Sequence, residues 1–144
     1  MNLPKYQVAA STPYLYHFYS EGPQGSIKKA IIYAQIEDNL FNLAFGDWDE
    51  ESRRINDSSR TNNQDRDKVL ATVAFTALDF TNQFPHVEIF AEGTTSARTR
   101  LYQMEIGNNL MEINRYFKIE GFVNGEWEFF LRGKNYEAFL IYRK

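Results

Sequence analysis

The stretch HVEIFAEGTTSARTRLYQM, residues 86–104, carries the signals of a strand, a sharp turn and a helix start in direct succession. The alternation of Val87, Ile89 and Ala91 predicts a strand with one apolar face. Gly93 then frees the backbone to turn sharply. A strand that leads directly into a helix indicates a fold that combines a sheet with helices.

The helix that follows begins with hydroxyl side chains, Thr94, Thr95 and Ser96, of which we expect Thr95 to be the N-cap. A helix N-terminus presents unpaired amides and a partial positive charge, and Arg98 and Arg100 add to that charge in the first turn. This combination favours an anion. We therefore predict a site for an anionic ligand or a partner at the turn 92–100.

Two simpler explanations exist for these arginines. Surface ion pairs, for example from Arg98 to Glu105, would contribute less than about 1 kcal/mol. A buried acidic partner, Glu21 or Glu92, would instead make a structural ion-pair cluster with Arg98 and Arg100. The choice depends on whether the carboxylates face each other or face the arginines.

The chain after this stretch predicts more sheet. The helix is interrupted at 107–109 and resumes over 110–116. Asn124-Gly125, the strongest hairpin signal in the chain, joins expected strands at 117–123 and 126–131. A last strand is expected over 136–142.

The chain before the stretch predicts a meander of strands and a helix. The expected strands are 6–9, at an edge, and then 14–20, 27–36 and 40–45. Residues 46–63 are charged and polar, which predicts a mobile loop. A helix capped by Asn62 or Asn63 should run to Gln83 with its apolar stripe on the sheet. A strand, helix, strand order favours parallel pairing of strand 86–91 with an earlier strand.

Composition limits the classes of protein. The 144 residues, 43% of them hydrophobic, suit a single domain over 1–144 with a real core. The net charge of −3 argues against a charge-driven nucleic-acid or membrane binder. The chain has no cysteine and no apolar run of the ~20 residues that span a bilayer. We expect a cytoplasmic protein without membrane contact and without a cofactor.

Three local strings resemble a known fold. FYSEGPQGSIKKAIIYAQI, TNNQDRDKVLATVAFTALDF and VEIFAEGTTS are similar to the first hairpin, the Thr-Asn-Asn run with its following acid, and the fourth strand of the ribonuclease H-like fold. The resemblance implies an α+β fold with a mixed sheet. Its element order would be three antiparallel strands, helix, strand and helix, followed here by a hairpin and strand at the C-terminus.

The same resemblance implies a metal site. If strand 14–20 lies parallel to strand 87–91, Glu21 and Glu92 lie at the carboxyl ends of neighbouring strands, with Asp65 and Asp67 in the helix between them. Three carboxylates, Glu21, Asp67 and Glu92, would then hold Mg²⁺ or Mn²⁺ for phosphodiester cleavage. The family uses Asp where this chain has Glu21 and Glu92. Each carboxylate has a simpler role, Glu21 as a turn residue and both aspartates as partners of the helix dipole.

A second resemblance concerns GTTSARTRLYQ, which is similar to a signature in small bacterial proteins grouped as a domain of unknown function. It implies no activity. Our first hypothesis is a non-catalytic or weakly catalytic module that binds a protein or an anionic ligand, nucleic acid included, at the turn 92–100. The alternative is a metal-dependent nuclease or phosphodiesterase.

The remaining side chains of note have simple expected roles. His17 and His86 have no second ligand at metal spacing and should be strand side chains. Trp48 should be exposed in the polar loop and available to an interface. Trp127, in the C-terminal hairpin, should belong to the core.

Overall fold

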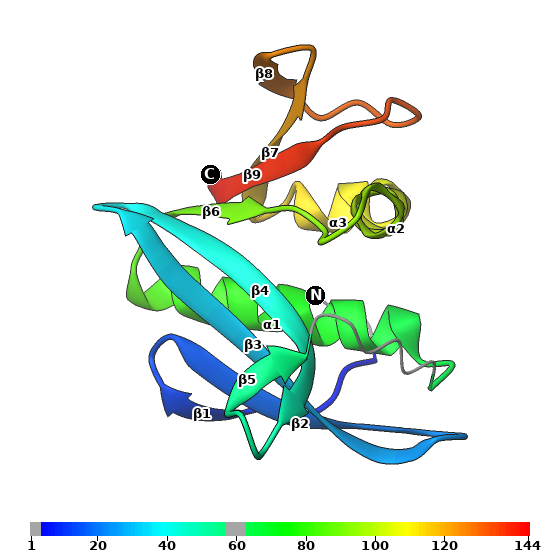
Figure 1. Ribbon diagram of the computed structural model, residues 1–144. Helices are drawn as coiled ribbons and strands as arrows, with labels where there is room; N and C mark the ends of the chain where they lie inside the picture. Colours follow the sequence, from blue (N-terminus) through cyan, green and yellow to red (C-terminus); the bar gives the residue numbers. More distant parts are fainter. Residues whose placement is uncertain (1–3, 57–62) are drawn as a thin grey trace. The chain divides into compact units, whose positions relative to one another are not determined.

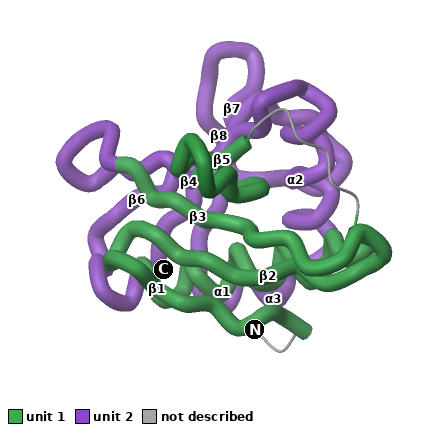
Figure 2. Tube along the Cα trace, turned by 60° about the horizontal axis from the view of Figure 1, so that its bottom comes forward, with its two compact units in different colours: residues 1–34, 44–80 green, residues 35–43, 81–144 purple. Residues whose placement is uncertain are grey.

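The computed structural model describes residues 4–56 and 63–144. The chain forms two compact units (Figure 2). Unit 1 comprises residues 1–34 and 44–80, and unit 2 comprises residues 35–43 and 81–144. Two long strands, β3 (Gly25–Glu37) and β4 (Leu40–Asp49), contribute residues to both units.

Unit 1 contains an antiparallel meander. Strand β1 (Ala9–Thr12) pairs with β2 (Leu15–Gly22), and β2 pairs with β3 along its whole length. A short strand, β5 (Arg54–Asn56), folds back on the end of β4 with Trp48 opposite Ile55. The predicted loop is therefore wrong for residues 46–49 and 54–56, which are strands, because Trp48 and Ile55 give this charged segment an apolar pair to bury. Residues 57–62 lie outside the described part.

Helix α1 (Arg66–Gln83) lies along β2 and β3 in unit 1 (Figure 1). Its predicted apolar stripe is confirmed by Val69, Val73, Ala77 and Phe80, all buried. Phe80 stacks on Tyr33 with ring centroids 4.3 Å apart, and the Tyr33 hydroxyl lies 2.9 Å from the Thr76 hydroxyl. Burial raises the pKa of Tyr33, so this phenol stays neutral.

A polar cluster fastens the β2–β3 hairpin to the start of α1. The buried Asn63 amide group donates to the Ser20 hydroxyl (3.1 Å) and to the Gly25 carbonyl (2.9 Å), and its oxygen accepts from the Gln24 N–H (2.7 Å). A Cβ on Gly22 would lie 2.1 Å from the Asn63 carbonyl oxygen. The Asn63 side chain therefore holds the β2–β3 hairpin through hydrogen bonds and does not act as the expected helix cap, since α1 begins at Arg66.

Unit 2 contains the second part of the sheet. Strand β6 (Glu88–Ala91) pairs parallel with residues 40–42 of β4 and antiparallel with β9 (Ala138–Arg143). Strand β7 (Phe117–Val123) pairs with β9 on one side and with β8 (Glu126–Phe129) on the other. Residues 124–125 turn the β7–β8 hairpin as predicted, with positive φ at both positions.

Helices α2 (Ser96–Asn108) and α3 (Leu110–Ile113) cover one face of the unit 2 strands (Figure 1). The buried core there consists of Ile119, Phe130, Tyr136 and Phe139. Side chains from both helices pack on it: Tyr102, Ile106, Leu110 and Ile113. The opposite face of these strands carries no helix among the described elements of unit 2.

The architecture is a mixed α+β fold with mostly antiparallel strand pairing, as the sequence predicts. Parallel pairing of β6 with an earlier strand is also confirmed, but its partner is β4. The expected pairing with strand 14–20 is wrong, because β2 is already paired on both edges, with β1 and β3. The first strand also differs, since β1 occupies residues 9–12 and Tyr6 enters the polar cluster instead.

Candidate functional site

The predicted strand, turn and helix start at residues 86–104 form as expected. Strand β6 ends at Ala91, and α2 begins at Ser96. Thr95 is the N-cap, and its hydroxyl accepts a hydrogen bond from the Arg98 N–H at 3.2 Å. This bond satisfies one of the amides that a helix start leaves open.

The turn before α2 is packed tightly on the helix. A Cβ on Gly93 would lie 2.4 Å from the Thr99 nitrogen, so only glycine fits there. The buried Thr99 hydroxyl accepts from the Gly93 N–H (2.9 Å), and the Thr99 N–H donates to the Thr95 carbonyl (3.1 Å). The turn thus satisfies several of its own amides and offers an anion fewer backbone donors than the sequence implies.

The two arginines of this turn have different environments. Arg98 is half-buried and has an interaction partner within the protein, whereas Arg100 is exposed, as are Glu92, Thr94, Thr95 and Ser96. The predicted site for an anion or partner at residues 92–100 stays a prediction. Its hydroxyl and arginine side chains do lie at one helix start.

Two of the acids considered for the metal site, Glu21 and Asp65, have hydrogen-bond partners within unit 1. In unit 1, the Glu21 carboxylate accepts from the Ser26 hydroxyl (2.8 Å), and Asp65 accepts from the hydroxyls of Tyr6 (2.6 Å) and Ser20 (2.5 Å). Burial and the Asp65 carboxylate raise the pKa of Tyr6, so it remains a donor. Asp65 therefore completes the polar cluster around Asn63 and has a structural role.

The other two acids of the metal hypothesis are exposed. Asp67 lies in the first turn of α1, as a partner of the helix dipole would, and Glu92 belongs to unit 2. Across residues 4–56 and 63–144, no three His, Asp or Glu side chains form a group that could hold a metal ion. The nuclease hypothesis with Glu21, Asp67 and Glu92 stays a prediction that no contact in the structure favours.

The expectations for the two tryptophans are both wrong. Trp48 is half-buried in β4, where its ring meets the edge of His17 with centroids 5.1 Å apart. Trp127 is 39% exposed on β8. The sequence could not assign these faces, because exposure on a strand depends on which face the helices cover.

Three large apolar side chains on β8 and directly after it are exposed. Trp127, Phe129 and Leu131 are 39%, 65% and 58% exposed. Trp127 and Phe129 alternate with Glu126, Glu128 and the buried Phe130, so they share one face of β8, and Leu131 follows the end of the strand. This face is the one opposite α2 and α3, because Phe130 packs into the core beneath those helices.

We define the open face of unit 2 as the side chains of β6, β7, β8 and β9 that point away from α2 and α3. Its principal members are Phe90, Glu120, Phe122, Trp127, Phe129 and Tyr142. The Trp127 ring contacts Phe122 (centroids 5.1 Å apart) and Phe90 (6.2 Å). Aromatic side chains from three strands therefore form one cluster on an exposed sheet surface.

Carboxylates lie beside this cluster. Glu120 accepts a hydrogen bond from the Tyr142 hydroxyl at 2.5 Å. This bond, burial, and the charges of Glu120 and the exposed Glu88 raise the pKa of Tyr142 to about 12. The open face therefore carries negative charge next to its aromatic rings.

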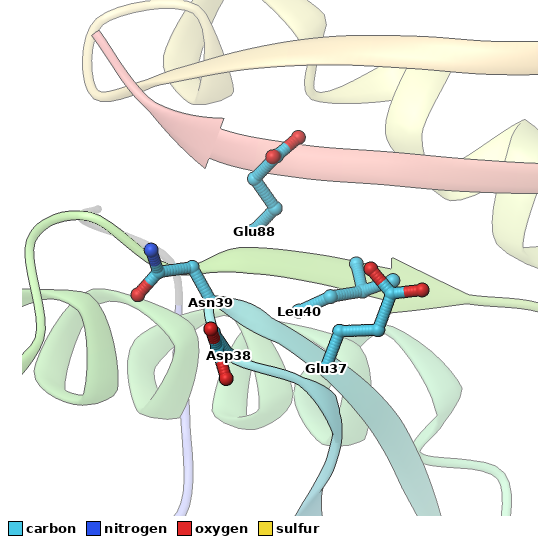
Figure 3. A pocket seen from close by; sticks show the side chains of 5 residues that line it. All are labelled: Glu37, Asp38, Asn39, Leu40 and Glu88. Atoms are coloured by element: carbon cyan, nitrogen blue, oxygen red, sulfur yellow. The ribbon is translucent and has the colours of Figure 1, made fainter.

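A hollow of about 410 Å³ adjoins Glu88, at the turn between β3 and β4 (Figure 3). Glu37, Asp38, Asn39 and Leu40 line it from the turn, and Glu88 lines it from β6. The Asn39 carbonyl accepts from the Glu88 N–H at 2.6 Å, which ties the turn to the strand. Three carboxyl groups make this end of unit 2 acidic.

The segment after β8 is fixed by Tyr136, whose ring lies on β7 where Gly121 has no side chain. A Cβ on Gly121 would lie 2.3 Å from that ring. The Tyr136 hydroxyl accepts from the Leu131 N–H (3.0 Å) and donates to Glu128 (2.9 Å), and Lys134 pairs with Glu128 at 2.8 Å. These contacts hold the exposed Phe129 and Leu131 in place.

The fold and the open face define a mixed α+β protein in which α2 and α3 pack on one face of the unit 2 strands. The chain belongs to DUF6934, a family of unknown function, whose model matches residues 2–144. The expected membership of a domain of unknown function is confirmed to that extent. The ribonuclease H-like resemblance and the GTTSARTRLY-type signature are not confirmed by this match.

Two further comparisons add no relative. Neither the curated proteins nor the solved structures contain a match to this chain. Within the described part of the chain, no helix has the length and apolar character that a membrane span requires.

Proposed function

We propose that this protein is a non-catalytic binding module that takes a protein partner on the open face of unit 2. One observation carries the proposal: Trp127 and Phe129 on β8, and Leu131 just after it, expose large apolar side chains, the two strand residues on the sheet face opposite α2 and α3. Exposed apolar patches of this kind mark interaction sites in soluble proteins.

The energetics support such a contact. Burying an aromatic side chain of this size against a partner stabilises a complex by about 1.5–3 kcal/mol. Aromatic residues with fixed positions lose little conformational entropy on binding. Tyr136 and the pair of Lys134 with Glu128 fix the segment that carries Phe129 and Leu131, so the surface is already ordered.

Charge favours a protein partner over a nucleic acid. Aromatic rings on a sheet can stack on bases, but that binding also needs cations to neutralise phosphates. Here Glu88 and Glu120 lie among the aromatic side chains, and Lys118 is the cation of β7 on that face. The surface would repel a phosphate backbone.

The test is an NMR titration of the ¹⁵N-labelled full chain with three pools of short peptides, apolar-basic, apolar-acidic and polar uncharged. We expect saturable shifts at β7, β8 and β9 with the apolar-basic pool. Phe129→Ser should abolish them, and Tyr19→Ser, which removes an aromatic side chain 53% exposed in unit 1, should keep them.

Two outcomes would contradict the proposal. One is the absence of saturable shifts at the open face with every pool at millimolar peptide. The other is unchanged binding by Phe129→Ser, because the bound surface would then lie elsewhere.

A further inference from the structure

We infer that the partner segment binds as an extended strand along the free edge of β8, and that its side chains alternate between apolar and basic. This inference rests on the proposed function and specifies the partner of the same surface. It depends on the hydrogen-bonding pattern of β8 and on the charges along it.

The edge of β8 is available for strand pairing. In the sheet order β8 is the terminal strand, with β7 as its neighbour. The Phe130 N–H donates to the Ile119 carbonyl at 3.0 Å, and the β7–β8 register continues from that pair with Glu128 opposite Gly121. Because hydrogen-bonded positions alternate along an antiparallel pair, the backbone groups of Trp127 and Phe129 point away from β7.

The length of this edge is set by the turn that follows. The Leu131 N–H is bonded to the Tyr136 hydroxyl, so the open backbone positions end at Phe129. A short extended segment suffices to pair with Trp127 and Phe129. Strand addition of this kind takes its affinity from main-chain bonds and its specificity from alternate side chains.

The side chains along the edge specify the segment. Trp127 and Phe129 lie on the open face, where an added strand would present apolar residues beside them. Glu126 and Glu128 lie on the other face, and Glu126 is exposed. Opposite charges directly across a strand pair are favourable, so a basic residue fits the position beside the exposed Glu126, whereas Glu128 already pairs with Lys134. Glu120 and Glu88 add negative charge on the open face itself.

The same glutamates argue against a second copy of this chain as the occupant. Self-pairing of β8 centred on Trp127, with the aromatic side chains on one face, would set Glu126 and Glu128 of the two copies opposite each other. Like charges directly opposite are destabilising, and charged side chains protect an edge from self-association. The glutamates therefore select for a basic segment and against the chain itself.

The probe is a seven-residue capped peptide that alternates valine and lysine. Three matched peptides serve as controls: one with glutamate for each lysine, and two with the lysine sequence but N-methyl groups on the amides of one strand edge or of the other, of which only the peptide methylated on the paired edge should lose binding. We expect the first peptide to bind at least about tenfold more tightly than the glutamate peptide or the peptide methylated on the paired edge, since tenfold corresponds to one lost hydrogen bond or charge pair of about 1.4 kcal/mol. Two N-methyl peptides, one for each edge, cover both orientations.

Amide hydrogen exchange gives a second measurement, because contact through side chains alone would not slow exchange of the backbone amides. Binding should slow exchange at the Trp127 and Phe129 amides, which point outward, and leave Glu128, already bonded to β7, unchanged. Glu126→Lys should weaken the lysine peptide and strengthen the glutamate peptide. Asp67→Lys, the same kind of change at an exposed acid in unit 1, should do neither.

The outcomes separate this inference from the proposed function. If the lysine peptide shifts the open face but N-methylation and amide exchange show no effect, the strand inference fails and the binding module stands. If no peptide pool reaches the open face, the proposed function fails as well. If β8 amides become protected with rising protein concentration alone, the occupant is a second copy and the inference of a basic partner is overturned.

Discussion

The polar cluster of unit 1 and the open face of unit 2 differ in their contacts. The polar groups of the cluster are hydrogen-bonded to one another, whereas the open face exposes apolar side chains. Around Asn63, the donors and acceptors of Ser20, Asp65 and Tyr6 are bonded to one another inside the unit. On the open face, Trp127 and Phe129 remain exposed although their apolar area would be worth burying. The cluster has hydrogen-bond partners within its own unit, whereas contact with another molecule would bury apolar area of the open face.

This difference shows where function is to be sought in the chain. Acids near strand ends and helix starts indicate a site from the sequence, but one Asp65 oxygen, Oδ2, accepts from two hydroxyls within unit 1 and so has a structural role. Aromatic residues in a hairpin indicate a core, but Trp127 and Phe129 lie on the face of the unit 2 strands opposite α2 and α3 and are exposed. The polar cluster stabilises the fold, and the open face is the better candidate for binding.

The largest loss of stability in the polar cluster should come from Asn63→Ala. This change removes four hydrogen bonds and leaves the Gln24 N–H and the Gly25 carbonyl without their partner, so we expect a loss of about 2–4 kcal/mol in the free energy of unfolding. Urea unfolding measures it. Asn108→Ala at an exposed position of α2 is the control and should change the free energy by less than about 0.5 kcal/mol. A cost for Asn63→Ala as small as for the control would show that the Asn63 hydrogen bonds are not what holds the hairpin.

Gly93→Ala tests whether the turn before α2 is packed too tightly to accept a side chain. Because a Cβ there would overlap the Thr99 nitrogen and Arg98, we expect a destabilisation of about 1–3 kcal/mol. Thermal unfolding measures the change. Gly107→Ala in α2 is the matched control, since its Cβ would meet no atom closer than 3.9 Å. Equal stability of the two variants would mean that the turn can shift to accommodate a Cβ. Its backbone amides could then also rearrange to bind an anion at residues 92–100.

His17 offers a pH test within unit 1. Its Nδ1 is buried without a hydrogen-bond partner among the described residues, and burial together with the Lys28 charge lowers its pKa below 6.5, against an opposing effect of Glu50. The unfolded chain therefore binds this proton at higher pH than the folded chain does. Stability is complete above about pH 6.5 and falls as the pH drops through the lowered pKa.

The measurement is the free energy of unfolding by urea at about pH 7.5 and about pH 5.5, above the range in which carboxylates titrate. The wild type should lose stability at the lower pH, and His17→Gln should lose less. His86→Gln, which changes an exposed histidine, should behave as the wild type does. An equal pH dependence in all three proteins would show that His17 is not buried as a neutral side chain.

Much of the fold follows from local sequence signals. Asn124-Gly125 predicts the β7–β8 hairpin because both positions need positive φ, and Thr95 predicts the start of α2 because its hydroxyl caps an amide. The partner of β6 does not follow, since β2 and β4 have similar alternation and only the packing of the whole chain selects β4. Strand pairing between distant segments is decided by contacts that no local pattern contains.

The proposed binding surface follows from the sequence only in part. The alternation of Trp127, Phe129 and Leu131 with Glu126 and Glu128 is visible in the sequence and predicts a strand with two different faces. Which face is covered depends on where α2 and α3 pack, and that depends on Phe130 and Ile119 reaching the same core. The helix start at residues 92–100 is more conspicuous in the sequence, but its amides are largely used by its own turn.

A substitution on the open face should change stability least, because its side chain is exposed. Phe129 is 65% exposed, so Phe129→Ser should change the free energy of unfolding by less than about 0.5 kcal/mol. Phe18→Ala, at a position 2% exposed in unit 1, should cost about 3–5 kcal/mol. Parallel urea titrations compare the two. A stable Phe129→Ser that no longer binds the apolar-basic peptides would assign Phe129 to recognition, whereas a large loss of stability would show that its ring belongs to the fold and that the open face is closed in solution.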